Sequence, residues 1–464
     1  MRVESPSFTI TEPNRVPILK LDYTHDSTAL FQVFAGEQHA ILFDSGKPWQ
    51  HQGRYDILSA WPREQLQITT AGIEHTCGEV TRQLPDIHAV KALLSQRWQS
   101  AMSDLPFCGG WMGFASYELG YHLEPHSGQA HENPILPLFW AGYYDWAIIQ
   151  DHQQQTCQLV YAEDMPAKRL QKIQQQLQNK TNRHDFSLAG AFTSSLSYQG
   201  YTEAFARIQG YLQAGDCYQV NFAQRYQAGF RGDAFTAFQA LRQVVPSPYM
   251  VYLNHPQAPI LSISPERFIQ AKGQHVFTKP IKGTAPRQPS TEADAESAKA
   301  LQHSSKNRAE NLMIVDLLRN DFGRYCNPGS IRVEELFALE SFSNVHHLVS
   351  SIRGDIAPPN TIWDLFFASL PGGSITGAPK IRACQIINEL ENFNREIYCG
   401  SLFYASNNGR FDSSIAIRTL LCHQGNIYAW AGGGIVKDSA CDDEYQECTN
   451  KIGHLLQALE AHQG

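Results

Sequence analysis

The sequence predicts an α+β protein built from antiparallel strands and helices. Residues 1–165 contain short strand-like segments separated by turns, and they are rich in aromatic residues and glycine. Residues 217–226 alternate between two sets of side chains, as a strand with two different faces does. Helical periodicity follows at roughly 295–319, 361–369, 379–391 and 439–460. This mixture differs from the regular strand–helix alternation of a βαβ protein.

The first predicted lobe spans residues 1–177 and ends in a helix. Its strands include 40–43 and 138–144, and Leu170, Ile173 and Leu177 then follow helical spacing. Residues 178–196 are polar with little periodicity, so we expect a linker there. The second predicted lobe therefore covers residues 197–464.

The second lobe opens with a predicted helix at 202–214, and Gly215 is expected to end it. A strand is predicted over 274–278, with Lys282 close to its end. Further strands are expected over 413–421 and 426–431. These elements would hold the polar residues considered below.

Composition excludes several classes of partner. With 464 residues, 42% of them hydrophobic, the chain can bury a large core. The net charge is −8, and no run of lysine or arginine stands out. Nucleic acids and acidic membranes are therefore not expected as partners, because binding to phosphates needs clustered positive charge. No segment has the length of a membrane span.

The cysteines indicate a reducing compartment. The chain has 10 cysteines, and no pair has the spacing of a zinc knuckle or a redox motif. The N-terminus lacks the apolar core of a signal peptide. We therefore expect buried, reduced thiols in a cytoplasmic protein.

Lys282 is the most informative single residue. A lysine held at a strand end and partly removed from water can lose its proton near neutral pH and act as a nucleophile. A solvated surface lysine is the alternative. The residues that follow favour the nucleophile.

Two groups of carboxylates accompany this lysine. Glu310 lies beside Met313 and Ile314 on a helix that is mostly apolar, so it needs either an arginine partner or a bound cation. Glu444 and Glu447 share a helix face with Lys451, after a capping box predicted from Ser439 to residue 442. A solvated acidic face is one interpretation, and a magnesium site completed by an anionic ligand is the other.

Two glycine-rich segments and one arginine suit an anionic ligand. Residues 371–380 run into a predicted helix, whose free N–H groups attract carboxylate or phosphate. Residues 431–435 either form a tight turn or let a ligand contact the backbone. Arg418 is a charge within an apolar strand pattern, where it either pairs with a structural carboxylate or clamps the carboxylate of a substrate.

Longer motifs match one family of enzymes. These motifs are 215–221, 264–267, 309–311, 371–380, 417–419 and 431–434. On them the chain resembles the chorismate-utilising enzymes from about Tyr198 to Leu459. Residues 1–165 match less tightly, through 44–46, 54–57 and 144–146. The resemblance implies a large two-lobed fold, with antiparallel sheets packed as a sandwich, helices outside, and chorismate bound by the second lobe.

Within this family, the residue between Ile281 and Gly283 separates activities. Anthranilate synthases look similar but carry alanine there. Lysine is typical of the branch that makes 4-amino-4-deoxychorismate, on the route to p-aminobenzoate and folate. Isochorismate and salicylate synthases place a water-activating lysine where this chain has Gln219. The resemblance thus implies amination, with anthranilate synthase component I or a non-catalytic ligand-binding partner subunit as rivals.

The resemblance also implies roles for single residues. Lys282 would attack C2 of chorismate as the 4-hydroxyl leaves, Glu266 would act as general acid and base, and His347 would assist. The substrate would contact Gly283, Thr284, Ser374, Tyr398, Arg418, Gly432, Gly434 and Lys451.

A metal ion and a partner protein are implied in the same way. Mg2+ held by Glu310 and Glu447, with Glu444 close by, would grip the ring carboxylate. Relatives obtain ammonia from a separate glutamine amidotransferase subunit, and no glutaminase motif is found in this chain.

The resemblance finally implies a tryptophan pocket. The N-terminal part of relatives binds tryptophan, and part of that pocket is matched here. The matching residues are Ser45, Arg54, Tyr55, Pro248, Tyr249 and Met250.

Overall fold

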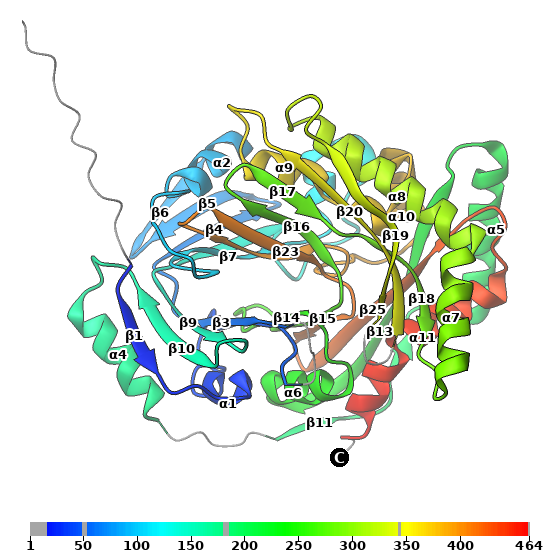
Figure 1. Cartoon of the computed structure of the whole chain (residues 1–464). Helices are drawn as coiled ribbons and strands as arrows, with labels where there is room; N and C mark the ends of the chain where they lie inside the picture. Colours follow the sequence, from blue (N-terminus) through cyan, green and yellow to red (C-terminus); the bar gives the residue numbers. More distant parts are fainter. Residues whose placement is uncertain (1–15, 49–52, 180–184, 342–344, 463–464) are drawn as a thin grey trace, which may run out of the picture.

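Two large sheets dominate the computed structural model, which describes residues 16–48, 53–179, 185–341 and 345–462. Their strands pair in antiparallel fashion. Figure 1 shows one sheet above the other, with helices on the outer sides of both. The predicted α+β class, with antiparallel sheets packed as a sandwich, is therefore confirmed.

Sheet I contains 13 strands in the described residues. In spatial order they are β1 (Ile18–Leu21), β10 (Thr156–Tyr161), β9 (Trp146–Asp151), β3 (Tyr55–Ser59), β2 (Ile41–Asp44), β14 (Tyr249–Leu253), β15 (Ile260–Ser264), β24 (Thr419–His423), β25 (Asn426–Ile435), β13 (Gln219–Gly232) and β11 (Phe186–Leu188), with β12 (Thr193–Ser194) and β21 (Gly377–Ala378) also paired to β13.

Sheet II contains 12 strands in the same part of the chain. In spatial order they are β18 (Ile281–Pro286), β20 (Val345–Asp355), β17 (His275–Thr278), β16 (Arg267–Lys272), β23 (Arg410–Ile415), β22 (Ser401–Ser406), β7 (Gly110–Ala115), β8 (Phe139–Tyr144), β4 (Glu64–Thr69), β5 (Gly72–Cys77) and β6 (Val80–Leu84), with β19 (Arg332–Ser341) paired to β20.

Both sheets join the two predicted lobes. Strand β2 pairs with β14 in sheet I, and β7 pairs with β22 in sheet II. The described part of the predicted linker contributes β11 and β12, which both pair with β13. Hydrogen bonding within the sheets thus continues across the boundaries at 177 and 197, and the functional division of the chain there stays a prediction.

Helices cover the outer faces of both sheets. Beneath sheet I lie α1 (Ser27–Phe31), α4 (Ala167–Leu177), α6 (Ala234–Val244) and α11 (Cys441–Glu460), whose apolar side chains join those of the sheet in one cluster. The others are α2 (Ile87–Ser95), α3 (Leu119–Leu123), η1 (Pro125–Ser127), α5 (Tyr198–Ala214), α7 (Thr291–His303), α8 (Ser305–Gly323), α9 (Ile362–Ser369), η2 (Gly373–Ile375) and α10 (Lys380–Leu390). A second cluster joins the sheets to each other, since it contains Ile41 and Val251 of sheet I with Met112 and Phe403 of sheet II.

Local capping explains where two helices of the second predicted lobe begin or end. Helix α5 begins after Ser197, whose hydroxyl accepts a hydrogen bond from the Gly200 N–H, and it ends at Gly215 with a φ of 81°. The single helix predicted over 295–319 is wrong. Ser304 has an extended backbone and caps α8 through the Asn307 N–H, so α7 and α8 are separate helices.

Two further local predictions are corrected. The strand predicted over 413–421 divides into β23 and β24, because Arg418 adopts a left-handed φ of 51° between them. The capping box predicted from Ser439 does not form. The N-cap of α11 is Ala440, and the Ser439 hydroxyl instead donates to Glu444 Oε1 at 2.7 Å.

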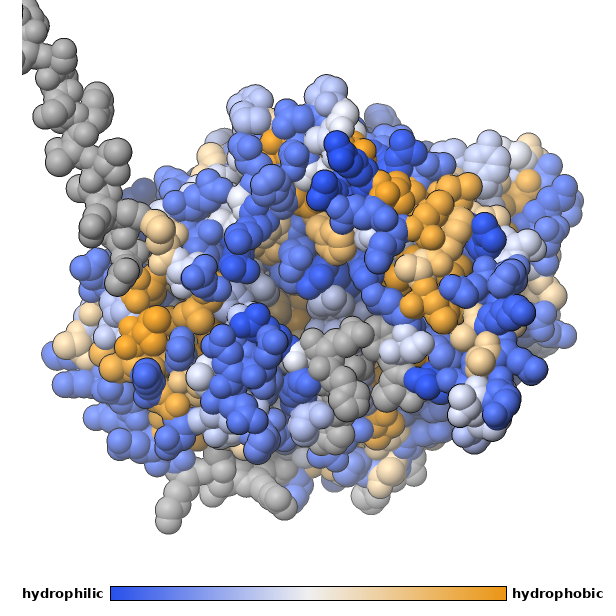
Figure 2. All heavy atoms as spheres, viewed as in Figure 1, coloured by the Kyte–Doolittle hydropathy of each residue, from blue (hydrophilic) through white to orange (hydrophobic). Residues whose placement is uncertain are grey.

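The surface is mostly hydrophilic on the face seen in Figure 2, with several hydrophobic patches between the polar residues. Leu312 of α8 and Leu336 of β19 are both 46% exposed. In the described ranges, no helix is both long and apolar enough to cross a membrane.

Candidate active site

Lys282 lies within β18 rather than at the end of the predicted strand, which is β17. Its Nζ is 3.3 Å from Glu310 Oε2, and the two side chains are 18% and 15% exposed. Helix α8 carries Glu310 and packs against β18. The next residue, Gly283, has a φ of 98°, and a Cβ there would lie 3.0 Å from Asn307 Cγ of α8. Glycine therefore lets the strand approach the helix that presents Glu310.

Glu266 is buried at the turn between β15 and β16. Burial raises the pKa of Glu266 to about 7, although a backbone hydrogen bond from Ile281, the charge of Lys282 and a hydrogen bond with Ser374 oppose this rise. These contacts place Glu266 beside Lys282 and Ser374. A carboxyl group with such a pKa can give or take a proton at neutral pH.

Each of the three predicted metal carboxylates faces a lysine. The Nζ–O distances are 3.3 Å for Lys282–Glu310, 3.8 Å for Lys306–Glu444 and 2.6 Å for Lys451–Glu447. The alternative of an arginine partner for Glu310 is therefore wrong, since the partner is Lys282. Lys306 was missed in the sequence, because only the packing of α8 near α11 brings it to Glu444.

The carboxylates differ in environment. Burial raises the pKa of Glu444. Burial also acts to raise the pKa of Glu447, but the charge and hydrogen bond of Lys451 outweigh it, so this pKa is lowered. No group of three or more His, Cys, Asp or Glu side chains in the described residues is gathered closely enough to hold a metal ion. The carboxylate oxygens still fit Mg2+ by donor type. In the present structure the ammonium group of a lysine lies beside each of these carboxylates.

The glycines at 431–435 belong to strand β25, so the tight-turn alternative is wrong. A Cβ on Gly432 would lie 2.6 Å from Phe222 O, and one on Gly433 would lie 3.0 Å from Glu444 Oε2. Lys451 Nζ donates to Gly432 O at 3.1 Å. Glycine is thus needed for the close approach of β13 and of the α11 side chains to this strand.

The segment 371–380 forms η2 and the short strand β21 before α10 begins. Pro379 is the N-cap of α10, one position earlier than the first turn for which it is suited. Ser374 points toward Glu266, as their hydrogen bond requires. The segment therefore lies beside the carboxyl group that is predicted to act as an acid.

His347 and Thr284 face each other across β18 and β20. The Thr284 hydroxyl and His347 Nδ1 are 2.8 Å apart. Burial lowers the pKa of His347 to about 4, and the nearby positive charge of Arg418 acts in the same direction. His347 is therefore neutral at physiological pH.

Arg418 and Tyr398 complete the predicted substrate residues. Burial lowers the pKa of Arg418, and no carboxylate of the described residues contributes to this shift. The structural-carboxylate alternative thus finds no support there. The Tyr398 ring is buried and lies parallel to Trp430, with 6.4 Å between the ring centroids.

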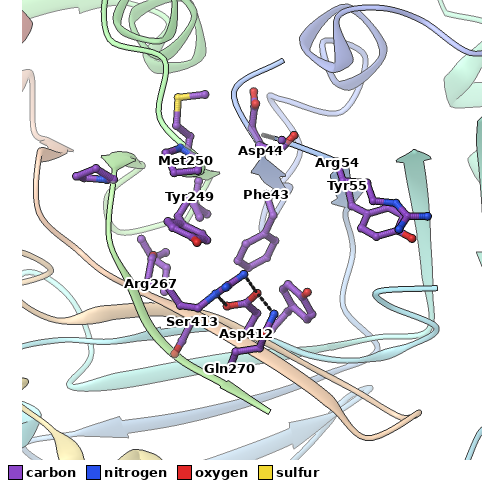
Figure 3. A pocket seen from close by; sticks show the side chains of 18 of the residues that line it. Phe43, Asp44, Arg54, Tyr55, Tyr249, Met250, Arg267, Gln270, Asp412 and Ser413 are labelled. Carbon is purple, nitrogen blue, oxygen red and sulfur yellow. Dashed lines mark hydrogen bonds and ion pairs between the residues drawn. The ribbon is translucent and has the colours of Figure 1, made fainter. Parts of the chain in front are cut away.

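A separate cavity of about 440 Å3 lies between the two sheets. All residues predicted for the tryptophan pocket line it: Ser45, Arg54, Tyr55, Pro248, Tyr249 and Met250. Figure 3 shows the rings of Phe43 and Tyr249 next to the ion pair of Arg267 with Asp412, and the Arg267 guanidinium lies over the Tyr249 ring, 5.0 Å from its centroid. The ion pair of Arg267 with Asp412, at 3.0 Å, was not predicted, because the partners are 145 residues apart and meet only through the pairing of β16 with β23.

The cavity and the predicted active site share parts of the chain. Pro265 and Ile281 line the cavity, whereas their neighbours Glu266 and Lys282 belong to the predicted active site. Because side chains alternate along a strand, Ile281 and Lys282 of β18 point to opposite sides. The cavity and the predicted active site therefore lie on opposite sides of strand β18.

Known proteins resemble the chain along nearly its whole length. The profile of the chorismate binding enzyme family matches residues 38–457. Aminodeoxychorismate synthase component 1 of Escherichia coli is 43% identical over 427 residues, which cover 91% of this chain and 93% of that protein. Anthranilate synthase component 1 of Acetivibrio thermocellus is 31% identical over 472 residues and 96% of each chain. The crystal structure of anthranilate synthase component I from Streptococcus pneumoniae has a TM-score of 0.78 at 28% identity and covers 87% of this chain and 92% of its own. The chain described here belongs to the chorismate binding enzyme family.

Proposed function

We propose that this chain converts chorismate and ammonia to 4-amino-4-deoxychorismate through a covalent bond to Lys282. The observation that carries the proposal is the position of Lys282, which lies beside Glu310 and Glu266 and is largely removed from solvent. The 43% identity to aminodeoxychorismate synthase component 1 of E. coli supports the same reaction. Such a product leads to p-aminobenzoate and folate.

The chemistry begins with the neutral amine of Lys282. This nitrogen bonds to C2 of the ring, the double bonds shift, and the C–O bond at C4 breaks. Glu266, with a pKa raised by burial to about 7, gives its proton to the leaving hydroxyl, which departs as water. Ammonia then bonds to C4, the double bonds return, and Lys282 leaves C2. The surplus proton on nitrogen returns to Glu266.

Charged residues around the ring would hold chorismate in place. Arg418, whose pKa is shifted by burial and by no carboxylate of the described residues, would bind a carboxylate of the substrate. Ser374, Thr284 and Lys451 offer further donors near Glu266, His347 and Gly432. His347 stays neutral, so it would accept or donate one hydrogen bond without adding charge. Gly283, Gly432, Gly434 and Tyr398 would line the same site.

Glu310 and Glu447, with Glu444 nearby, would hold Mg2+. When bound, this ion supplies a Lewis acid for the ring carboxylate of chorismate. Lys282, Lys306 and Lys451 now neutralise these carboxylates, so each ammonium group has to give up its partner when the carboxylate ligates a cation.

A separate amidotransferase would supply the ammonia, and tryptophan would fill the cavity between the sheets. The cavity supports the second proposal, because it is lined by aromatic rings and by charged groups that suit an amino acid. Residues 1–177 and 197–464 both contribute to its walls. A cytoplasmic location remains a prediction.

One experiment tests the proposed reaction. The chain is incubated with chorismate, Mg2+ and ammonium, and the product is identified by mass. The expected product keeps the enolpyruvyl group, whereas anthranilate has lost it. Anthranilate would favour the rival synthase, and unchanged chorismate would favour a non-catalytic subunit.

A further inference from the structure

Asn311 belongs to a motif whose other polar residue, Glu310, has a role in the proposed reaction, whereas Asn311 has none. Its side chain is 1% exposed, and its Oδ1 accepts a hydrogen bond from Ser350 Oγ of β20 at 2.6 Å. Its Nδ2 has no partner among the residues that the structure describes. Leaving a buried donor unpaired is destabilising, and an apolar side chain of similar shape would avoid this cost. The cost indicates that the amide serves a purpose other than stability.

Ser350 joins three segments of the chain. It is 0% exposed, and its hydroxyl donates to Asn311 of α8 and accepts from the Phe337 N–H of β19 at 3.2 Å. Its own N–H donates to Pro280 O at 3.3 Å, directly before β18 begins. Ser350 therefore links helix α8 to the strand that carries Lys282.

Lys282 lies where the pairing of β18 with β20 is interrupted. Ile281 is opposite Val349 and Thr284 is opposite His347, so β18 has one more residue than β20 between these two pairs. Such a β-bulge redirects the side chains at its position. Because the regular ladder is interrupted at Lys282, the contacts beside the bulge have to hold this residue in place.

Lys282 and Ser350 point to the same side of sheet II. Ile281 and Val349 line the cavity between the sheets. Side chains alternate along a strand, so the residues that follow, Lys282 and Ser350, point to the opposite side, where α8 packs against β18 and β20. On that side Lys282 Nζ is 3.3 Å from Glu310 Oε2.

We propose that Asn311 and Ser350 are positioning residues, which together hold Lys282 and Glu310 in the arrangement that the first reaction step needs. This inference rests on the proposed amination and adds to it two residues that act through Lys282 and Glu310. The Ser350–Asn311 bond ties α8, which carries Glu310, to β20, which anchors β18 just before Lys282. Without this bond the helix and the bulge can shift relative to each other, and a displacement of about 1 Å can slow a reaction about 100-fold.

The test uses Ser350→Ala, Asn311→Leu and their combination, with Ser59→Ala as the matched control. Ser59 is also 0% exposed, and its hydroxyl donates to Trp146 O at 2.7 Å, between β3 and β9 of sheet I. The full chain is mixed with chorismate and Mg2+, and the adduct on Lys282 is followed by intact-protein mass in a single turnover. At saturating chorismate we expect the rate to fall about tenfold or more in Ser350→Ala and in Asn311→Leu, and to stay within about twofold of the parent protein in Ser59→Ala.

Further readouts separate positioning from a structural role. The double variant should be as slow as the single variants, within about threefold, because both changes remove the same bond. Its unfolding temperature should stay within about 3 °C of that of the parent protein, because replacing both partners of a buried hydrogen bond by apolar groups is nearly neutral. The chorismate concentration for half-maximal rate should change by less than about twofold.

A crystal structure of Ser350→Ala gives a readout that needs neither turnover nor the Asn311 variants. The distance from Lys282 Nζ to Glu310 Oε2 should exceed about 4 Å, beyond the range of an ion pair. If Asn311→Leu cannot be purified, this distance and the rate of Ser350→Ala together carry the test.

Any one of several results would overturn the inference. These are rates like those of the parent protein in Ser350→Ala and Asn311→Leu, an equal loss in Ser59→Ala, losses that multiply in the double variant, a parallel change in stability or in the chorismate requirement, and an unchanged distance from Lys282 to Glu310 in Ser350→Ala. If the parent protein forms the adduct and one of these occurs, only the positioning role fails. If the parent protein forms no adduct with chorismate, the proposed function fails first.

Discussion

The Nζ of Lys282 lies 3.3 Å from the Oε2 of Glu310, and the pair is mostly shielded from solvent. Lysine and glutamate reach each other from β18 and α8, which pack together. A carboxylate that neutralises an ammonium group cannot at the same time give its full charge to a metal ion. A metal ion bound at Glu310 and the Lys282–Glu310 ion pair therefore compete for the same carboxylate.

The first prediction concerns the nucleophile. Lys282→Ala should abolish the covalent chorismate adduct and lower kcat by about 100-fold or more, because no amine is left to bond to C2. Intact-protein mass spectrometry after incubation with chorismate and Mg2+ measures the adduct. Lys279→Ala is the matched control, since Lys279 pairs with Glu340 and lines the cavity instead of the active site. Full-speed amination by Lys282→Ala would exclude the covalent route.

The second prediction concerns the metal. Glu310→Gln removes one negative charge from the proposed Mg2+ site, and the affinity for Mg2+ should fall by about tenfold or more. Isothermal titration of the protein with Mg2+ measures this without relying on turnover. Glu340→Gln removes a similar charge near the cavity and should leave the titration unchanged. Identical curves for the parent protein and Glu310→Gln would remove Glu310 from the ligand set.

The third prediction concerns the pH dependence of activity. Burial raises the pKa of Glu266 to about 7, so the carboxyl group that acts as acid is lost as the pH rises through this value. The rate of adduct formation should therefore decline above about pH 7. Glu266→Gln should be slow at every pH and lose this decline, which single-turnover rates between about pH 6 and 9 would reveal. A decline that persists in Glu266→Gln would assign it to another group.

The fourth prediction concerns the stability of the protein and depends on the same carboxyl group, that of Glu266. The folded pKa of Glu266 is above its ordinary value of 4.5, so the folded protein binds the proton more tightly than the unfolded chain does. This stabilisation is fully present below about pH 4.5 and is lost as the pH rises through about 7, and the whole loss amounts to roughly 3 kcal/mol. As the pH rises from 5 to 8, Glu266→Gln should therefore become more stable relative to the parent protein. Urea unfolding at the two pH values measures the difference, and a constant difference would contradict the prediction.

The fifth prediction concerns the cavity. L-tryptophan should raise the unfolding temperature of the parent protein, because a ligand that binds only the folded state stabilises it. Tyr249→Ala removes a ring that lines the cavity, and it should weaken tryptophan binding by about tenfold or more. Tyr211→Ala, which alters a tyrosine of α5 bonded to Glu389, serves as control. Calorimetry that detects no heat with the parent protein would exclude tryptophan as the occupant.

Many local features followed from the sequence because their causes are local. The pattern of helix α5 and its stop at Gly215 depend on neighbouring residues alone. The glycines at 283, 432 and 434 belong to motifs that the sequence shows, although the atoms that a Cβ there would meet, in Asn307, Phe222 and Gln219, come from other elements. Lys282, Glu266 and Glu310 were found through motifs, since each lies in a short segment with a recognisable composition.

Other features depend on strands that are far apart along the chain. The sequence did not reveal that both sheets combine strands from either side of the predicted linker. The single helix predicted over 295–319 also missed the break at Ser304, where the backbone is extended and caps α8.

What the sequence alone determined is the α+β class and the family, and it supplied the candidate active-site residues, because periodicity and motifs reflect interactions between near neighbours. The tertiary structure decided which groups meet. It paired Lys306 with Glu444 and Arg267 with Asp412, and it joined Asn311 to Ser350. These contacts depend on the register and stacking of whole sheets, which no local pattern of residues specifies.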